Sequence, residues 1–448
     1  NPIVVDGSAV TLGRCGGTVA LASGATQTGF GRTGTVDWVT TVKTDSDSPL
    51  TVANGKGYFL NTNGGAITVN LPAGSAGDIV AFKDYNNTWD SNAVTVTPNG
   101  SDKIGGINAS AILQTESQSV TLVFIDSTKG WLDVQDSTSN VEGATFLCAS
   151  VSGTGNTLST APCCANTKIA TFTGPGTFTV NTAATVAANN EVSYIVVAGG
   201  AGGAAGQSAG GGAGGFRETK SPITPYTASP KCGYSTPGNR LTLGVAGYSV
   251  TIGAGGAGRC FPSSDNGVNG SNSGFSTITS VGGGGGGQFN GGGAAGGSGG
   301  GGGGNGPGNA GGAGNSPSVT PPQGNAGGDG NQPDAGGGAG GGATAAGANS
   351  VAPREGGAGG AGATTSISAS PTAYSGGGGG GAGTGAGGAG GTGGGGKGGS
   401  GNQPSISPAV AGTTNTGGGG GGGGNSPAAQ ANGKNGGSGI VIIRYKFQ

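Results

Sequence analysis

Residues 375–399 read SGGGGGGAGTGAGGAGGTGGGGKGG, and similar glycine runs recur through the second half of the chain. These runs lie near 281–304, 335–343, 356–363 and 417–424, and segments rich in Asn, Pro, Ser, Thr and Gln separate them. Glycine loses more backbone entropy on folding than any other residue and adds no apolar side chain, so such a region would ordinarily stay disordered. An ordered structure here requires a stabilising mechanism other than a hydrophobic core.

Long glycine runs can adopt the polyproline II geometry, with three residues per turn and a rise of about 3.1 Å per residue. Because glycine has no side chain, such helices can touch on all sides, bond their N–H groups to neighbours and add weak Cα–H···O contacts. We therefore expect a hexagonal bundle of polyglycine II helices over residues 191–448. The apolar segments Tyr194–Val197 and Gly437–Tyr445, which enter and leave this region, are predicted to pair and to clamp the bundle.

The preceding part of the chain has the alternating pattern of half-buried strands. Apolar and polar residues alternate through Ala66–Leu71, Asp78–Phe82 and Ser119–Phe124, with turn residues such as Asn63-Gly64-Gly65 between the runs. This pattern predicts a small β-sandwich or roll at 51–137, an attachment segment at 1–50, and a linker with short strands at 138–190. The predicted fold class is therefore all-β, with a clamped glycine-rich bundle at the C-terminal end.

Composition excludes several classes of function. The 448 residues include 114 glycines, no histidine and no methionine, and only 8% are charged, for a net charge of −1. Without histidine we expect no triad hydrolase and no histidine-ligated metal, and we predict no enzymatic activity, no cofactor and no metal site. The absence of a basic stripe argues against nucleic acid, and the absence of an 18-residue apolar run argues against membrane insertion. Because the chain starts at Asn1, we expect a processed product or a fragment.

The six cysteines form no CxxC pair. Two disulfides are plausible from position, one between Cys232 and Cys260 and one joining Cys148 to Cys163 or Cys164. Buried free thiols are the alternative.

Three strings in the N-terminal part carry a resemblance to known proteins. Leu71–Val80, Asn99–Ile104 and Thr121–Phe124, followed by Gly130-Trp131, resemble a β-domain that recurs in tail-fibre and virion-appendage proteins of bacteriophages. The likeness covers about 85 residues, and it implies no particular functional residues.

Three further strings resemble the glycine-rich domain of phage fibre proteins: Val196–Gly200 at the opening, Gly211–Glu218 soon after, and Gly437–Tyr445 at the close. The likeness covers about 250 residues. It implies that loops near 305–334, 364–374, 400–416 and 425–435 recognise a host surface. Arg217, Glu218 and Arg444 fall within these strings, and we expect them to make structural polar contacts beside the clamp.

Aromatic and amide side chains in these loops are suited to binding a glycan or a protein, although they could instead cap helix turns. The predicted receptor-binding residues are Gln323, Gln332, Tyr374, Asn402, Gln403 and Gln430.

The resemblance implies a fibre component of a phage virion, extracellular, with other virion proteins and a bacterial surface glycan or protein as partners. By the same resemblance we expect a homotrimer. Two alternatives remain open: a purely structural virion decoration or extracellular filament subunit, and an ice-binding protein. Long loops rich in Pro and Asn argue against the second alternative.

Overall fold

The computed structural model describes residues 36–138, 145–162, 164–305, 309–330, 336–351, 354–401, 407–425 and 432–448. It divides into two compact units, Asn1–Gly143 and Ala144–Gln448. The expected all-β class is confirmed, since the regular elements of the described residues are strands apart from three short 3-10 helices. These helices are η1 (Asp45–Asp47), η2 (Ala187–Asn190) and η3 (Pro237–Asn239).

The N-terminal unit is a two-sheet roll. Its first six strands alternate between the sheets, and within each sheet these strands pair in parallel. The sheet orders are β1-β3-β5-β8-β9 and β2-β4-β6-β7. The strands are β1 (Asp37–Thr44), β2 (Leu50–Thr51), β3 (Lys56–Asn61), β4 (Ile67–Asn70), β5 (Ile79–Asp84), β6 (Val94–Thr97), β7 (Ala111–Leu113), β8 (Ser119–Asp126) and β9 (Gly130–Ser137).

Strand alternation produces the core of this roll. In β4, for example, Ile67 and Val69 are buried while the intervening Thr68 is not, as expected for a strand with one face in the core. Two fully buried tryptophans, Trp89 and Trp131, fill the space between the sheets.

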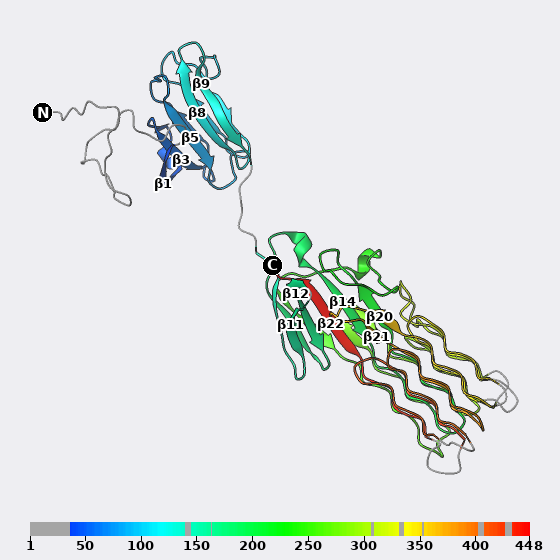
Figure 1. Ribbon diagram of the computed structural model, residues 1–448. Coiled ribbons are helices and arrows are strands. Elements are labelled where there is room, and N and C mark those ends of the chain that lie inside the picture. The colour runs from blue at the N-terminus through cyan, green and yellow to red at the C-terminus, as the bar shows by residue number, and fades with distance from the viewer. Residues whose placement is uncertain are drawn as a thin grey trace, which may run out of the picture. The chain divides into compact units, whose positions relative to one another are not determined.

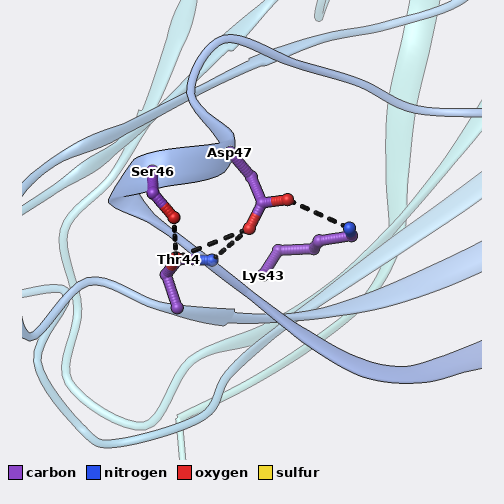
Figure 2. Close-up of polar contacts among 4 residues, drawn as sticks. All are labelled: Lys43, Thr44, Ser46 and Asp47. Atoms are coloured by element: carbon purple, nitrogen blue, oxygen red, sulfur yellow. Dashed lines mark hydrogen bonds and ion pairs between the residues drawn. The ribbon is translucent and has the colours of Figure 1, made fainter.

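The roll begins earlier than the sequence pattern predicted. β1 lies within the expected attachment segment at 1–50, but it pairs in parallel with β3 and so belongs to the first sheet. Figure 2 shows the turn that carries the chain from this sheet to the second: the Thr44 N–H donates to Asp47 Oδ2 (2.9 Å), and Lys43 Nζ lies 3.0 Å from Asp47 Oδ1. The hydrogen bond from Thr44, followed by that from Lys43, lowers the pKa of Asp47.

The second unit contains two larger sheets, ordered β10-β13-β17-β18-β19 and β11-β12-β22-β14-β15, with β16 paired to β14. A short hairpin, β20-β21, forms a sheet of its own. The strands are β10 (Cys148–Val151), β11 (Thr157–Ala161), β12 (Cys164–Phe172), β13 (Gly176–Thr182), β14 (Glu191–Val197), β15 (Phe216–Thr219), β16 (Leu241–Thr242), β17 (Ala246–Thr251), β18 (Ser273–Phe275), β19 (Ile278–Ser280), β20 (Ala363–Thr365), β21 (Thr372–Tyr374) and β22 (Ile440–Lys446).

The expected clamp between the first and last strands is present. β14 and β22 pair antiparallel, with Tyr194 opposite Ile443. The other edge of β22 pairs with β12, so the last strand of the chain occupies the centre of its sheet (Figure 1). The short strands expected at 138–190 are present, but the segment is not a linker. β10 and β13 belong to one sheet and β11 and β12 to the other, and their alternating residues contribute to the core between the two sheets.

Glycine tracts run side by side away from the sheets (Figure 1), and we call the tracts between residues 198 and 439 the glycine lattice. The tract at 199–204 shows how they are held. Successive N–H groups donate in turn to carbonyl groups of three neighbouring tracts, and every third N–H returns to the same tract. These tracts are 268–271, 434–437 and 209–212, and the N···O distances are 2.9 to 3.2 Å. Its carbonyls accept from three others, 256–259, 283–286 and 420–423. Three plus three gives six neighbours, the arrangement expected for a hexagonal bundle.

Only glycine fits most positions of this central tract. A Cβ on Gly200 would lie 2.1 Å from the Gly418 carbonyl oxygen, and one on Gly203 would lie 2.2 Å from that of Gly421. Every third residue of the tract lies on a face that has room for a methyl group, since Ala201 and Ala204 are both fully buried. The sequence AGGAGGA at 198–204 therefore has a three-residue repeat.

Candidate binding groove at the distal end of the glycine lattice

Several tracts leave a strand and end at turns on the side of the lattice away from the sheets, which we call the distal end. Tracts that follow β14, β17 and β19 reach turns at 205–207, 260–264 and 288–290. These turns and Asn425 enclose a groove of about 330 Å³. The groove is lined by Ala205, Gly206, Gln207, Phe261, Pro262, Ser263, Ser264, Gln288, Phe289, Asn290 and Asn425.

Two phenylalanines form the apolar part of the groove. The Phe261 side chain is 65% exposed, although its backbone N–H is held by Asn432 Oδ1 at 2.8 Å. Gly206 lies beneath it in the left-handed region (φ +66°), and a Cβ there would be 3.7 Å from the Phe261 ring. The carbonyl of Phe289, which is half-buried, accepts from the Asn305 N–H (3.0 Å) and from Asn309 Nδ2 (3.3 Å). Hydrogen bonds thus anchor the backbone at both phenylalanines.

Amide groups surround these rings. Gln288 is held through both its backbone and its side chain. Its backbone N–H donates to Asn266 Oδ1 (2.9 Å), and its side-chain Oε1 accepts from the Asn290 N–H (3.1 Å). The side chains of Asn290 and Asn425 are exposed and make no hydrogen bond within the described part of the chain. Asn425 is anchored through its backbone N–H, which donates to the Ala382 carbonyl (2.9 Å). The groove therefore combines a rigid frame with polar groups available to a ligand.

The predicted receptor-binding residues do not form this groove. Gln323 is fully buried, where its Oε1 accepts from the Val281 N–H (2.9 Å) and its Nε2 donates to the Pro317 carbonyl (3.1 Å). Tyr374 is also buried, within the apolar cluster that covers one face of the β22 sheet, and burial raises the pKa of its hydroxyl. Both belong to the internal structure, so their assignment to an exposed contact surface is corrected. Gln332, Asn402, Gln403 and Gln430 lie outside the described residues.

The groove was not predicted from the sequence, because the loops selected as the contact surface are longer and more polar than the turns that form the groove. The positions of the aromatic residues could have identified these turns. Between residues 253 and 439 aromatic side chains occur at Phe261, Phe275, Phe289 and Tyr374. Two of these four interrupt glycine tracts at turns instead of lying in strands.

The cysteine pairings are also corrected. Cys148, Cys232 and Cys260 carry free thiols, so neither the bridge between Cys232 and Cys260 nor one from Cys148 is formed. Cys163, the proposed partner of Cys148, lies outside the described residues. Among the residues described, no group of three or more acidic or cysteine side chains could hold a metal ion. In that same part of the chain, none of the helices is long and apolar enough for a membrane span.

A buried polar cluster lies beside the clamp. Glu218 on β15 is 2% exposed, and its carboxylate accepts from the Ser229 N–H (2.8 Å) and the Thr365 hydroxyl (2.6 Å). Arg444 on β22 is fully buried and lies over the ring of Tyr226, 5.5 Å from its centroid. As expected from the sequence, these residues make structural contacts, and they join the clamp to the β20-β21 hairpin.

Burial raises the pKa of Glu218 above its ordinary value of 4.5, against the opposing effect of its hydrogen bonds. The folded state therefore binds the carboxyl proton of Glu218 more tightly than the unfolded state does. The contribution of this proton to the free energy of unfolding is fully present below pH 4.5. It is lost as the pH rises through the elevated pKa. We expect Glu218→Gln to be more stable than the wild type at pH 8, by about 1 kcal/mol, and to lose less stability between pH 4.5 and pH 8.

Calorimetric unfolding at several pH values would check this result. Glu355→Gln is the matched control, because Glu355 is exposed on the same unit. Equal pH profiles for the wild type and Glu218→Gln would contradict the role of the buried carboxyl group.

Comparison with known proteins agrees with this two-part organisation. Residues 18–136 match the family model described as Bacteriophage T4 gp9/10-like protein, N-terminal. Over 87 residues the chain is 31% identical to baseplate wedge protein gp10 of Enterobacteria phage T4, an alignment that covers 19% of this chain and 14% of that protein. The chain thus matches well under two thirds of the length of this curated relative.

The second unit matches a different family model, described as a glycine-rich domain, over residues 171–446. This match extends from the end of β12 to the end of β22 and includes the whole glycine lattice. Together with the N-terminal match, it confirms the expected resemblance to phage fibre-type proteins with a glycine-rich domain. Because the model covers more than half of the 448 residues, the chain belongs to the glycine-rich domain family.

Proposed function

We propose that this protein is a non-enzymatic structural component of a phage tail, in a fibre or a baseplate, and that it lies on the outside of the virion. The similarity of residues 18–136 to the T4 gp9/10-like family and to a baseplate wedge protein supports this role. In this proposal the N-terminal roll joins other virion proteins, and the assembled form is a homotrimer.

The glycine lattice acts in this proposal as a rigid bundle of polyglycine II helices that holds its distal turns away from the sheets. Hydrogen bonds that return to the same neighbour every third residue support the three-residue turn of that helix. The alanine spacing at 198–204 supports the same turn. A bundle bonded through its backbone has few rotatable parts between the sheets and the distal end.

We further propose that the distal end recognises the host surface. The observation that carries this proposal is the distal groove, with an exposed aromatic ring on a turn whose backbone is anchored by a hydrogen bond. Exposed aromatic side chains in preformed grooves are common anchors of binding sites. Gln332, Asn402, Gln403 and Gln430 are proposed to extend the contact surface, as the sequence resemblance implied.

Labelled full-length protein incubated with bacterial cells tests the recognition role. It is expected to bind cells of a strain that the phage infects, to slow phage adsorption in competition, and to ignore strains that the phage does not infect. If it binds none of the infected strains, the host-recognition role is wrong. A structure of the assembled particle with the distal end buried between neighbouring subunits would favour the structural filament instead.

A further inference from the structure

We infer that the distal groove binds an uncharged saccharide of the bacterial surface, with Phe261 as the stacking platform. This inference rests on the proposed host-recognition function and specifies its ligand class. It follows from three properties of the groove: its aromatic surface, its amide groups and the absence of charge among the described residues that line it.

The aromatic surface suits the apolar C–H face of a pyranose ring. Phe261 is 65% exposed, so its ring is available for stacking in the groove. The Phe261 N–H donates to Asn432 Oδ1, which anchors the backbone of the turn, and Gly206 packs against the ring. Phe289 adds a second, half-buried apolar surface on the same groove.

The amide groups suit sugar hydroxyls, which both donate and accept hydrogen bonds. Asn290 and Asn425 are exposed, and each offers a carbonyl oxygen and an NH₂ group without a partner in the described chain. A hydroxyl of the Ser264 side chain lies on the same rim. A ligand without polar groups, such as an acyl chain, would leave these groups buried without partners, which costs binding energy.

The described residues that line the groove carry no charge, which disfavours an ionic ligand. None of these eleven residues is acidic or basic, and the neighbouring Asp265 carboxylate accepts from the Ser263 hydroxyl (3.3 Å). Arg259, just before the Phe261 turn, is half-buried and uses its Nε to hold the Asn266 carbonyl at 2.9 Å. An acidic saccharide or a phosphate would find no cation among the lining side chains, whereas a neutral sugar requires none.

The size and rigidity of the groove agree with a small ligand. Its volume of about 330 Å³ lies at the lower end of the range for small-molecule sites, enough for one or two sugar rings. The turns at 260–264 and 288–290 are anchored by hydrogen bonds from their backbone N–H groups, and the Ala204 N–H donates to the Ala209 carbonyl across the turn at 205–207. Little conformational entropy is therefore lost on binding.

Binding of the full-length protein to immobilised oligosaccharides tests this inference. The probes are neutral oligosaccharides of glucose, galactose and N-acetylglucosamine, alongside their sialylated and sulfated counterparts. We expect binding to at least one neutral probe and weaker binding to its charged counterparts. Phe261→Ala should reduce the affinity about tenfold or more, as for other aromatic anchors. Phe261→Trp, which retains the stacking surface, should keep it.

Val245→Ala is the matched control, because Val245 is equally exposed (66%) but lies in the loop between β16 and β17. It should leave binding unchanged. Unchanged thermal unfolding of Phe261→Ala would show that the loss does not come from unfolding.

Three results would overturn the inference: no binding to any neutral probe, preferential binding to the charged probes, or full binding by Phe261→Ala. If the wild type still binds host cells in any of these cases, host recognition stands and only the ligand class is wrong. Failure to bind cells as well would remove the proposed recognition function itself.

Discussion

Removal of residues 440–448 is expected to abolish the folding of the whole second unit, although it removes only the last strand. β22 is bonded on both edges, to β12 and to β14. Val441, Ile443 and Tyr445 enter the core between the two sheets, while Ile440 and Ile442 enter the cluster on the opposite face. Each such side chain contributes about 1.5 to 3 kcal/mol on burial, so losing all of them approaches the whole stability of a typical domain, about 5 to 15 kcal/mol.

Two spectroscopic signals separate the units in this experiment. All three tryptophans, Trp38, Trp89 and Trp131, lie in the N-terminal roll, so tryptophan fluorescence should still report its cooperative unfolding. Calorimetry should show that the second unit has lost its transition. A synthetic peptide of residues 437–448 added to the truncated chain should restore part of it, because β12 and β14 would then regain their common partner.

Removal of Gln448 alone is the control, since this exposed residue lies beyond β22. Ile443→Ala gives a graded version, with an expected loss of about 2 to 5 kcal/mol for a fully buried isoleucine. A truncated chain that retains the transition of the second unit would show that the lattice is stable without the central strand, contrary to this account.

A single methyl group inside the lattice should have the second large effect. We expect Gly200→Ala and Gly203→Ala each to destabilise the second unit by about 1 to 3 kcal/mol or more, as overpacked sites do. The added carbon would lie 2.1 Å from the Gly418 oxygen or 2.2 Å from the Gly421 oxygen, where real Cβ atoms require 3.0 Å. Both oxygens belong to a backbone that is itself hydrogen-bonded in the lattice, so relief requires a whole tract to move.

Gly244→Ala is the matched control for the lattice variants. A Cβ at Gly244 would meet nothing within 4 Å, so this change should be neutral or slightly stabilising through the entropy of the unfolded chain. Ala201→Gly tests the same geometry in reverse, since the methyl group of Ala201 is buried without a clash. Its loss should cost about 1 kcal/mol or less. Equal melting temperatures for Gly203→Ala and Gly244→Ala would show that the tracts are not closely packed.

Local sequence patterns were sufficient to predict the strands that have a clear apolar repeat. Alternation at 66–71 and 119–124 predicts β4 and β8, because a strand with one buried face must repeat every two residues. The unbroken apolar run at 440–443 predicts a strand buried on both faces, which β22 is. The opening and closing strings likewise predicted the pairing of β14 with β22 and the membership of the glycine-rich family.

The sequence patterns did not predict features that depend on residues far apart in the chain. The richness of 138–164 in Ser, Thr and Gly predicts a linker with short strands at 138–190, yet β12 pairs with β22, about 270 residues later in the chain. Gln323 resembles an exposed loop residue in the sequence, but the lattice buries it against Val281.

The all-β class, the terminal strand pair and the position of the glycine tracts could all be predicted from the amino-acid sequence. The three-dimensional structure was needed to show which tracts are neighbours, that Tyr374 and Gln323 are buried, and which turns meet to form the distal groove. This is because one glycine tract offers the same backbone groups as any other. Its hydrogen bonds therefore do not specify a partner, and the choice depends on the strands that begin and end the lattice and on the turns between its tracts.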